Sequence, residues 1–76
     1  MSTFINRMRY LQPKQFNQLL HSCGYRAEPH VVEVQFVRYV NDTETYHYQV
    51  RLEDDHQWLP AYVYFDFDKM KMNVLM

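Results

Sequence analysis

The sequence has few of the residues that several functional classes require. It contains one glycine and one cysteine, Gly24 and Cys23, in 76 residues. A single cysteine excludes an internal disulfide, and a single glycine argues against a glycine-rich loop that binds phosphate. No run approaches the ~18 apolar residues of a membrane-spanning helix. Arg7 and Arg9 are not followed by the apolar segment of a signal peptide. We therefore expect a cytoplasmic protein without a membrane segment.

Apolar side chains, in contrast, are plentiful. Hydrophobic residues make up 47% of the chain and aromatic residues 17%, a supply that disordered chains lack. The length predicts a single domain over residues 1–76, helical over 1–24 and an antiparallel sheet over 31–75. A domain of this size buries only ~60% of its unfolded surface, so dense packing or a partner subunit would add needed stability.

Residues 12–24 carry the signals of an amphipathic helix with both ends marked. Pro13 suits the first helical position, and Gln12 with Gln15 has the spacing of a weak capping box. Gly24 stands where a left-handed residue would end the helix. One apolar stripe follows at helical spacing: Phe16, Leu19, Leu20 and Cys23. Before this helix, residues 3–11 fit either a short helix or a short strand.

From residue 31 onward the apolar pattern changes to a period of two, which indicates strands. Three segments alternate in this way, and residues 70–75 form either a fourth strand or the end of the third. The predicted fold class is therefore α+β. One or two N-terminal helices pack on one face of a three- or four-stranded antiparallel meander, giving two layers.

The alternation assigns the strand residues to two faces of this sheet. The face toward the helix is predicted to carry Val32, Val34, Phe36, Val40, Tyr46, Tyr48, Val50, Leu52, Ala61, Val63, Phe65 and Phe67. The second face is predicted to carry Val31, Val37, Tyr39, His47, Arg51, Tyr62 and Tyr64.

The histidines and carboxylates do not form a convincing chemical site. His21 and Cys23 are two positions apart, so they point ~200° apart around a helix and cannot share one zinc ion. The acidic clusters at 53–55 and 66–68 fall at opposite ends of the third strand, which excludes one joint metal site. His47 is the best candidate for a general acid or base. We predict no enzyme activity, no metal and no cofactor.

The second sheet face is the most informative feature for function. Tyrosine and arginine on a rigid surface match the enrichment seen at protein interfaces. We predict an interface made of Val37, Tyr39, His47, Arg51, Tyr62, Tyr64, Asp54 and Asp55. Residues 31–76 hold four basic and eight acidic residues, a balance of −4, which suits a basic partner.

The leading hypothesis is thus a small non-enzymatic regulator or inhibitor that binds a larger, basic protein. Small size and the lack of a catalytic set also suit an inhibitor encoded by a phage or mobile element. Homodimerisation through the same face is a close variant, because it would relieve the stability shortfall.

The alternative hypothesis is a module that binds single-stranded nucleic acid. It would use Tyr39, Tyr62 and Tyr64 together with Arg38 and Arg51 on the sheet. The basic N-terminal part would supply phosphate contacts through Arg7, Arg9, Lys14 and Arg26. Residues 1–30 add four basic residues against one acidic residue, a balance of +3. The acidic sheet region makes nucleic acid the less favoured partner, because neutralising phosphates dominates such binding.

Overall fold

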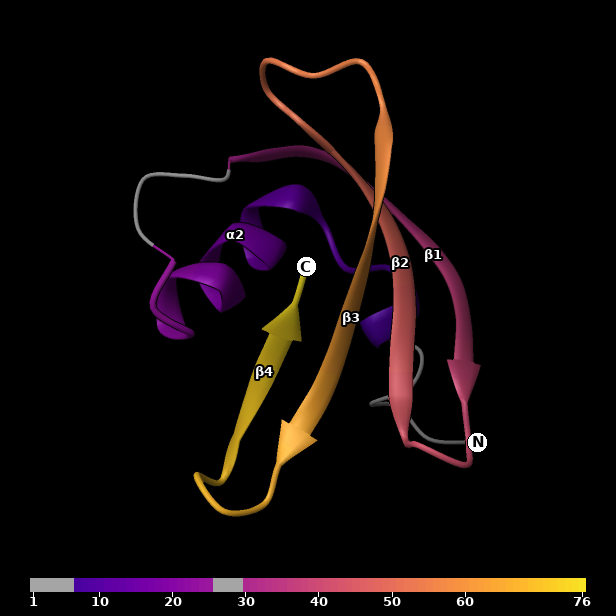
Figure 1. Ribbon diagram of the computed structural model, residues 1–76, viewed down its shortest axis with the longest axis vertical. Helices are drawn as coiled ribbons and strands as arrows, with labels where there is room; N and C mark the ends of the chain where they lie inside the picture. Colours follow the sequence, from indigo (N-terminus) through magenta and orange to yellow (C-terminus); the bar gives the residue numbers. More distant parts are fainter. Residues whose placement is uncertain (1–6, 26–29) are drawn as a thin grey trace.

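The computed structural model describes residues 7–25 and 30–76, in which a helix packs on one face of a four-stranded antiparallel sheet (Figure 1). Helix α2 spans Pro13–Ser22. The strands, neighbours in chain order, are β1 Val31–Val40, β2 Thr45–Leu52, β3 Trp58–Asp66 and β4 Lys71–Leu75. The predicted two-layer α+β class is confirmed, and the last strand is separate. Of residues 3–11, residues 7–9 are helical, and residues 3–6 lie outside the described part. None of the described helices has the length and apolar character needed to cross a membrane.

Helix α2 begins and ends where its sequence signals predict. The backbone N–H of Gln12 donates a hydrogen bond to Oε1 of Gln15 at 2.9 Å. At the other end Gly24 adopts a φ of +100°, which a residue with a Cβ avoids. The N–H of Tyr25 donates to the carbonyl of Leu20, and that of Gly24 to His21. This pair of bonds is the Schellman motif, which satisfies the last helical carbonyls.

The core lies between α2 and the sheet and is largely aromatic and β-branched. Phe16 packs edge-on against Tyr48, with ring centroids 5.7 Å apart. The ring of Phe36 also packs edge-on against Tyr48, with centroids 5.6 Å apart. The buried hydrophobic residues are Met8, Phe16, Leu20, Val31, Tyr46, Tyr48, Val50, Ala61, Val63 and Val74. The predicted helical stripe is confirmed, since Leu19 and Cys23 also pack against this cluster.

Helix α2 contacts the first and the last strand of the sheet, β1 and β4. On the β1 side, Nδ2 of Asn17 donates to the carbonyl of Val31 at 2.8 Å, and Oδ1 accepts from the N–H of Val31 at 2.9 Å. The side chain of Asn17 thereby substitutes for a neighbouring strand. On the β4 side, Sγ of Cys23 donates to the carbonyl of Met72 at 3.6 Å. The helix therefore occupies backbone groups at both edges of the sheet, positions where strands otherwise invite association.

Strand β1 departs from strict alternation at two points. The register shifts between Val31 and Glu33, and again between Phe36 and Arg38. Each shift inserts one residue into β1, a β-bulge, so the side chains beyond it change face. Val31 and Tyr39 consequently lie on the helix side, where Val31 is buried and Tyr39 packs on the core.

The predicted faces of several β1 residues are therefore wrong. Val31 and Tyr39 were expected on the second face and lie on the helix side instead. Val40 was expected on the helix side, but it pairs with Thr45 on the opposite face. Val32 lies at the first shift and is not part of the core cluster.

The two hairpin connections at the same end of the molecule share one backbone feature. Asn41–Glu44 joins β1 to β2, and Phe67–Met70 joins β3 to β4. The last residue of each has a positive φ, 51° for Glu44 and 52° for Met70. Glycine or asparagine is preferred in this conformation. Both loops therefore carry a small backbone strain.

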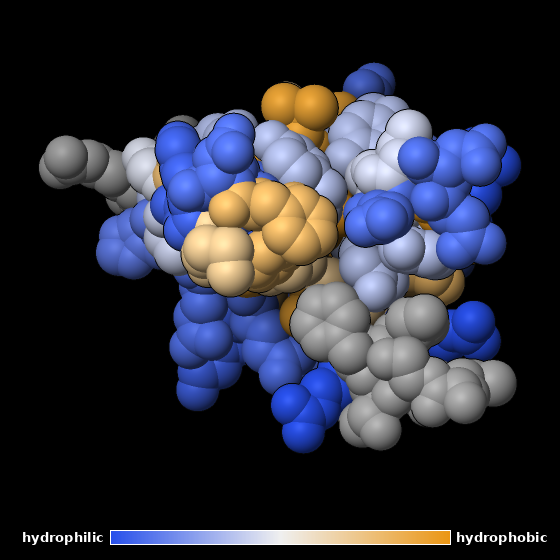
Figure 2. Space-filling model, turned by 90° about the horizontal axis from the view of Figure 1, so that it is seen from below, coloured by the Kyte–Doolittle hydropathy of each residue, from blue (hydrophilic) through white to orange (hydrophobic). Residues whose placement is uncertain are grey.

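Phe65 and Phe67, which were predicted on the helix-facing side of the sheet, are not covered by the helix. Phe65 is 36% exposed and Phe67 69% exposed. Their rings contact each other, with centroids 4.9 Å apart. Figure 2 looks at this end of the molecule and shows an apolar patch left of centre, bordered by hydrophilic side chains.

The buried hydroxyl of Tyr48 donates a hydrogen bond to the carbonyl of Met8 at 2.7 Å. Replacing Tyr48 by phenylalanine removes this donor and leaves a buried carbonyl unpaired. We expect the free energy of unfolding, measured with urea, to fall by about 1–2 kcal/mol. Tyr10→Phe, at an exposed position, should change it by less than about 0.5 kcal/mol.

The same tyrosine gives the fold a pH dependence. Burial, with a smaller contribution from Tyr46, raises the pKa of Tyr48 above its ordinary value of 10.0. The unfolded tyrosine loses its proton first, so the stability present below pH 10 is lost as the pH rises toward the folded pKa. We expect wild-type unfolding free energy to fall above about pH 10 and Tyr48→Phe to show a smaller fall. Equal slopes in the two proteins would contradict a buried, protonated Tyr48. Burial also raises the pKa of Tyr46, so the unfolding free energy of Tyr48→Phe should still fall to some extent as the pH rises.

Candidate protein-binding surface

The face of the sheet turned away from α2, termed the outer face, has no covering element among the described residues. Its side chains form rows across the strands because the register is continuous from β2 to β4. One row runs through Arg38, His47, Tyr62 and Leu75, one residue from each strand. In this row the rings of His47 and Tyr62 pack edge to face, with centroids 4.8 Å apart. The outer face is thus a continuous surface with an ordered centre.

Aromatic and apolar groups are concentrated on the β3 and β4 side of the outer face. Trp58 is 42% exposed and Leu75 is 58% exposed, while Tyr62 and Tyr64 are half-buried. Tyr64 also accepts a long hydrogen bond of 3.5 Å from Nδ2 of Asn73. A surface of this kind offers a partner large apolar contacts whose side chains are already held in place.

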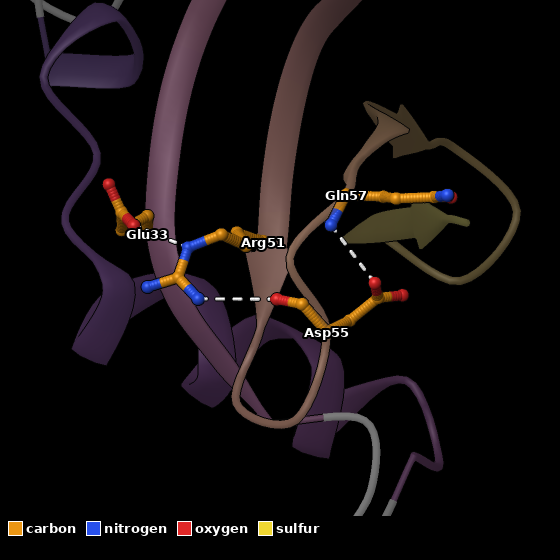
Figure 3. Close-up of polar contacts among 4 residues, drawn as sticks. All are labelled: Glu33, Arg51, Asp55 and Gln57. Carbon is orange, nitrogen blue, oxygen red and sulfur yellow. Dashed lines mark hydrogen bonds and ion pairs between the residues drawn. The ribbon is translucent and has the colours of Figure 1, made fainter.

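The turn between β2 and β3 is held by Arg51 (Figure 3). The guanidinium forms an ion pair with Glu33 on β1 and donates to the carbonyl of Asp55 at 3.2 Å. Oδ1 of Asp55 in turn accepts from the N–H of Gln57 at 2.9 Å. Arg51 and Asp55 therefore order the end of the outer face. The neighbouring Glu53 and Asp54 are exposed and give this end a negative surface.

The structure brings together most, but not all, of the predicted interface residues. His47, Arg51, Tyr62 and Tyr64 share the outer face, as predicted. Val37 is exposed at the second bulge of β1. Asp54 and Asp55 lie in the β2–β3 turn, at one end of the outer face. Tyr39 does not join them, because the bulge at Val37 turns it toward Tyr46, with ring centroids 4.6 Å apart.

Two outer-face residues were missed by the sequence reasoning. Trp58 pairs with Arg51, and Leu75 pairs with Tyr62. The period-two pattern of Tyr62 and Tyr64 extends back to Trp58, so this signal was present in the sequence. Leu75 required the existence and register of β4. Pro60 lies between the two tyrosines and Trp58, outside the β3 segment that pairs with β4, where its missing N–H is tolerated.

Two cationic residues of the N-terminal part, Arg9 and Lys14, lie on the helix side of the sheet. The guanidinium of Arg9 sits over the ring of Phe36 at 5.6 Å from its centroid, and Phe36 packs on the core beneath α2. Lys14 is exposed on α2 itself. These positive charges therefore do not border the outer face.

Two features of the described residues bear on metal and catalytic chemistry. Within residues 7–25 and 30–76, no three histidine, cysteine or acidic side chains are grouped so that they could hold a metal ion. A pocket at the C-terminal end of α2 is lined by Cys23, Gly24, Tyr25, Tyr64, Asn73 and Val74. His47, the predicted candidate for acid–base chemistry, is not among these residues.

Comparison of the chain with protein-family models, with curated proteins and with solved structures gave no match. The geometry of the molecule is therefore the basis for its proposed function.

Proposed function

We propose that this protein is a small non-enzymatic binding module that recognises a larger, basic protein through the outer face and the acidic β2–β3 turn. The observation that carries the proposal is the uncovered outer face, where Trp58, Tyr62 and Leu75 present apolar area on one rigid sheet. Aromatic anchors of this kind dominate the binding energy of protein interfaces. A module without a catalytic set would act as a regulator or inhibitor by covering the surface of its partner.

The charges around the outer face favour a basic partner. The positive charge of Arg51 is offset by Glu33 at the turn end of the face, and the central row carries one exposed cation, Arg38. Glu53 and Asp54 are exposed at the end of the face, where they would meet lysine or arginine at the rim of an interface. Rim charges of this kind contribute mainly to the association rate and to the choice of partner.

Single-stranded nucleic acid is the second candidate and is supported by the exposed Trp58 and the half-buried tyrosines. Two observations weigh against it. Arg51 is held by Glu33 and by the carbonyl of Asp55, and Arg9 lies on the helix side of the sheet. A strand stacked on the outer face would therefore have few cations for its phosphates.

The double substitution Tyr62→Ser and Tyr64→Ser tests the proposal. The variant should remain folded by circular dichroism, because both side chains are half-buried on the outer face. Its affinity for a partner captured by the wild type should fall by about 100-fold, measured calorimetrically with the purified partner. Lys14→Ser, on the helix side, serves as the matched control and should bind as the wild type does.

Two results would contradict the protein-binding proposal. One is an unfolded double variant, which would make Tyr62 and Tyr64 part of the core. The other is a wild type that binds single-stranded oligonucleotides with an affinity falling steeply between low and moderate salt.

Asp54→Lys distinguishes protein binding from nucleic-acid binding further. It should weaken binding to a basic protein and strengthen binding to nucleic acid.

A further inference from the structure

A second exposed apolar surface lies at the end of the β3–β4 hairpin. It consists of Phe65, Phe67 and Met70, termed the hairpin patch, and Figure 2 shows it facing the viewer. Met70 is 71% exposed and Phe67 69% exposed. The patch lies at the opposite end of β3 from the acidic β2–β3 turn (Figure 1). It is therefore a different surface from the acidic end of the proposed binding face.

Helix α2, whose main strand contacts are with β1 and β4, leaves the hairpin patch uncovered. Ala61 and Val63 are buried in the core, whereas Phe65 and Phe67, farther along the chain, are exposed. The three side chains expose about 350 Å² of apolar surface, taking about 200 Å² for a whole side chain of this size. This area is within the range of the largest patch on a monomer, which is often functional.

We propose that the hairpin patch binds the same patch of a second copy of this chain, giving a two-fold symmetric dimer. The charges around the patch carry the choice of occupant. Asp66 accepts hydrogen bonds from the N–H groups of Asp68 and Lys69, and Lys71 donates to the carbonyl of Ser22 on α2. The exposed charges beside the patch are then one acidic and one basic side chain, Asp68 and Lys69. A border with both signs offers no net attraction to a strongly basic or acidic partner. It is complementary to itself when a two-fold axis places opposite charges face to face.

The adjacent residues Asp68 and Lys69 are both exposed. Around a two-fold axis through the patch, Asp68 of one subunit approaches Lys69 of the partner subunit, and the same pair forms on the other side of the axis. The apolar residues then lie between two ion pairs, the arrangement of an apolar centre with a polar rim. The patch is small beside standard interfaces, so we expect a dissociation constant of about 10–100 µM.

Sedimentation equilibrium of the full chain between about 10 µM and about 1 mM tests the dimer. The double substitution Phe67→Ser and Met70→Gly should raise the dissociation constant at least tenfold. Met70→Gly also relieves the positive φ of 52°. In dilute solution, where both proteins are monomeric, this variant should therefore melt no lower than Phe67→Ser alone. Loss of association then cannot be attributed to loss of fold.

A charge exchange tests the geometry of the dimer. Asp68→Lys and Lys69→Asp, each made alone, place like charges across the axis and should weaken the dimer at least about fivefold. The two together restore opposite charges and should return the dissociation constant to near its wild-type value. Failure of the double exchange to rescue would overturn the two-fold arrangement.

Other occupants give different results. A wild type that remains monomeric at about 1 mM overturns the proposal. If this monomer also sediments with phosphatidylcholine vesicles, the hairpin patch binds a lipid surface and not a second copy of the chain. A dimer that survives Phe67→Ser with Met70→Gly but dissociates with Tyr62→Ser and Tyr64→Ser places the dimer contact on the outer face. That result overturns the hairpin contact. Whether the outer face also binds a basic protein is then decided by the binding measurement with the purified partner.

Discussion

Phe16→Ala is expected to lower the free energy of unfolding by about 3–5 kcal/mol. Phe16 is fully buried and contacts the ring of Tyr48, which lies at the centre of the core. Alanine loses the apolar transfer energy of the ring and leaves a cavity between α2 and the sheet. A chain of this length has roughly 4–11 kcal/mol of stability in total. The variant should therefore be partly or wholly unfolded near physiological temperature.

Urea unfolding followed by circular dichroism measures this loss. Phe16→Leu retains most of the apolar volume and should lose about 1–2 kcal/mol, well below the alanine variant. Lys14→Ala, at an exposed position two residues away on the same helix, should change stability by less than about 0.5 kcal/mol. A loss below about 1 kcal/mol for Phe16→Ala would mean that α2 does not seal the core.

Asn17→Ala should lower the free energy of unfolding by about 2–4 kcal/mol, because it removes two hydrogen bonds from one half-buried site. The N–H and the carbonyl of Val31 both lose their partner. Val31 is itself buried, so water reaches these backbone groups poorly. The expected loss is large for a polar side chain, and Gln18→Ala on the exposed side of α2 is its matched control.

Asn17→Asp separates the two bonds. The carboxylate can still accept from the N–H of Val31, but its second oxygen then faces the carbonyl of Val31 and repels it. At neutral pH we expect Asn17→Asp to be at least as destabilised as Asn17→Ala. Below about pH 4 the carboxyl is protonated and can donate, so part of the loss should be recovered relative to wild type. Wild-type stability in Asn17→Asp at neutral pH would contradict the paired contact.

Local signals predicted α2 and β2 because each depends on residues close in sequence. Pro13 and Gly24 mark the ends of the helix through their own backbone preferences. Strand β2 alternates without interruption, so Tyr46, Tyr48 and Val50 are buried as the period requires. In these elements the secondary structure and the buried face follow from one pattern.

Strand β1 shows where the pattern fails. An inserted residue at Val32 and another at Val37 change which side the following residues face, and each of these valines directly follows another apolar residue. A period-two count cannot distinguish a bulged valine from a paired one, because either side of the strand accepts it. Tyr39 was therefore assigned to the wrong face, and with it one member of the predicted interface.

The hairpin patch was missed for a different reason. Phe65 continues the alternation of Ala61 and Val63, and the pattern correctly places it on the helix side of β3. Its exposure depends on which part of the sheet the helix covers, and the alternation along one strand carries no information on that packing.

The placement of α2 across both edges also affects how the chain folds. The thiol of Cys23 and the carbonyl of Met72 that accepts its bond are 49 residues apart in sequence. The helix therefore cannot complete its contacts until the C-terminal strand has joined the sheet. Contacts between residues so far apart in sequence slow folding. They also require the N-terminal and C-terminal parts of the chain to become ordered in the same transition. We infer that this small protein folds as one cooperative unit, in which neither the helix nor the first hairpin is stable by itself.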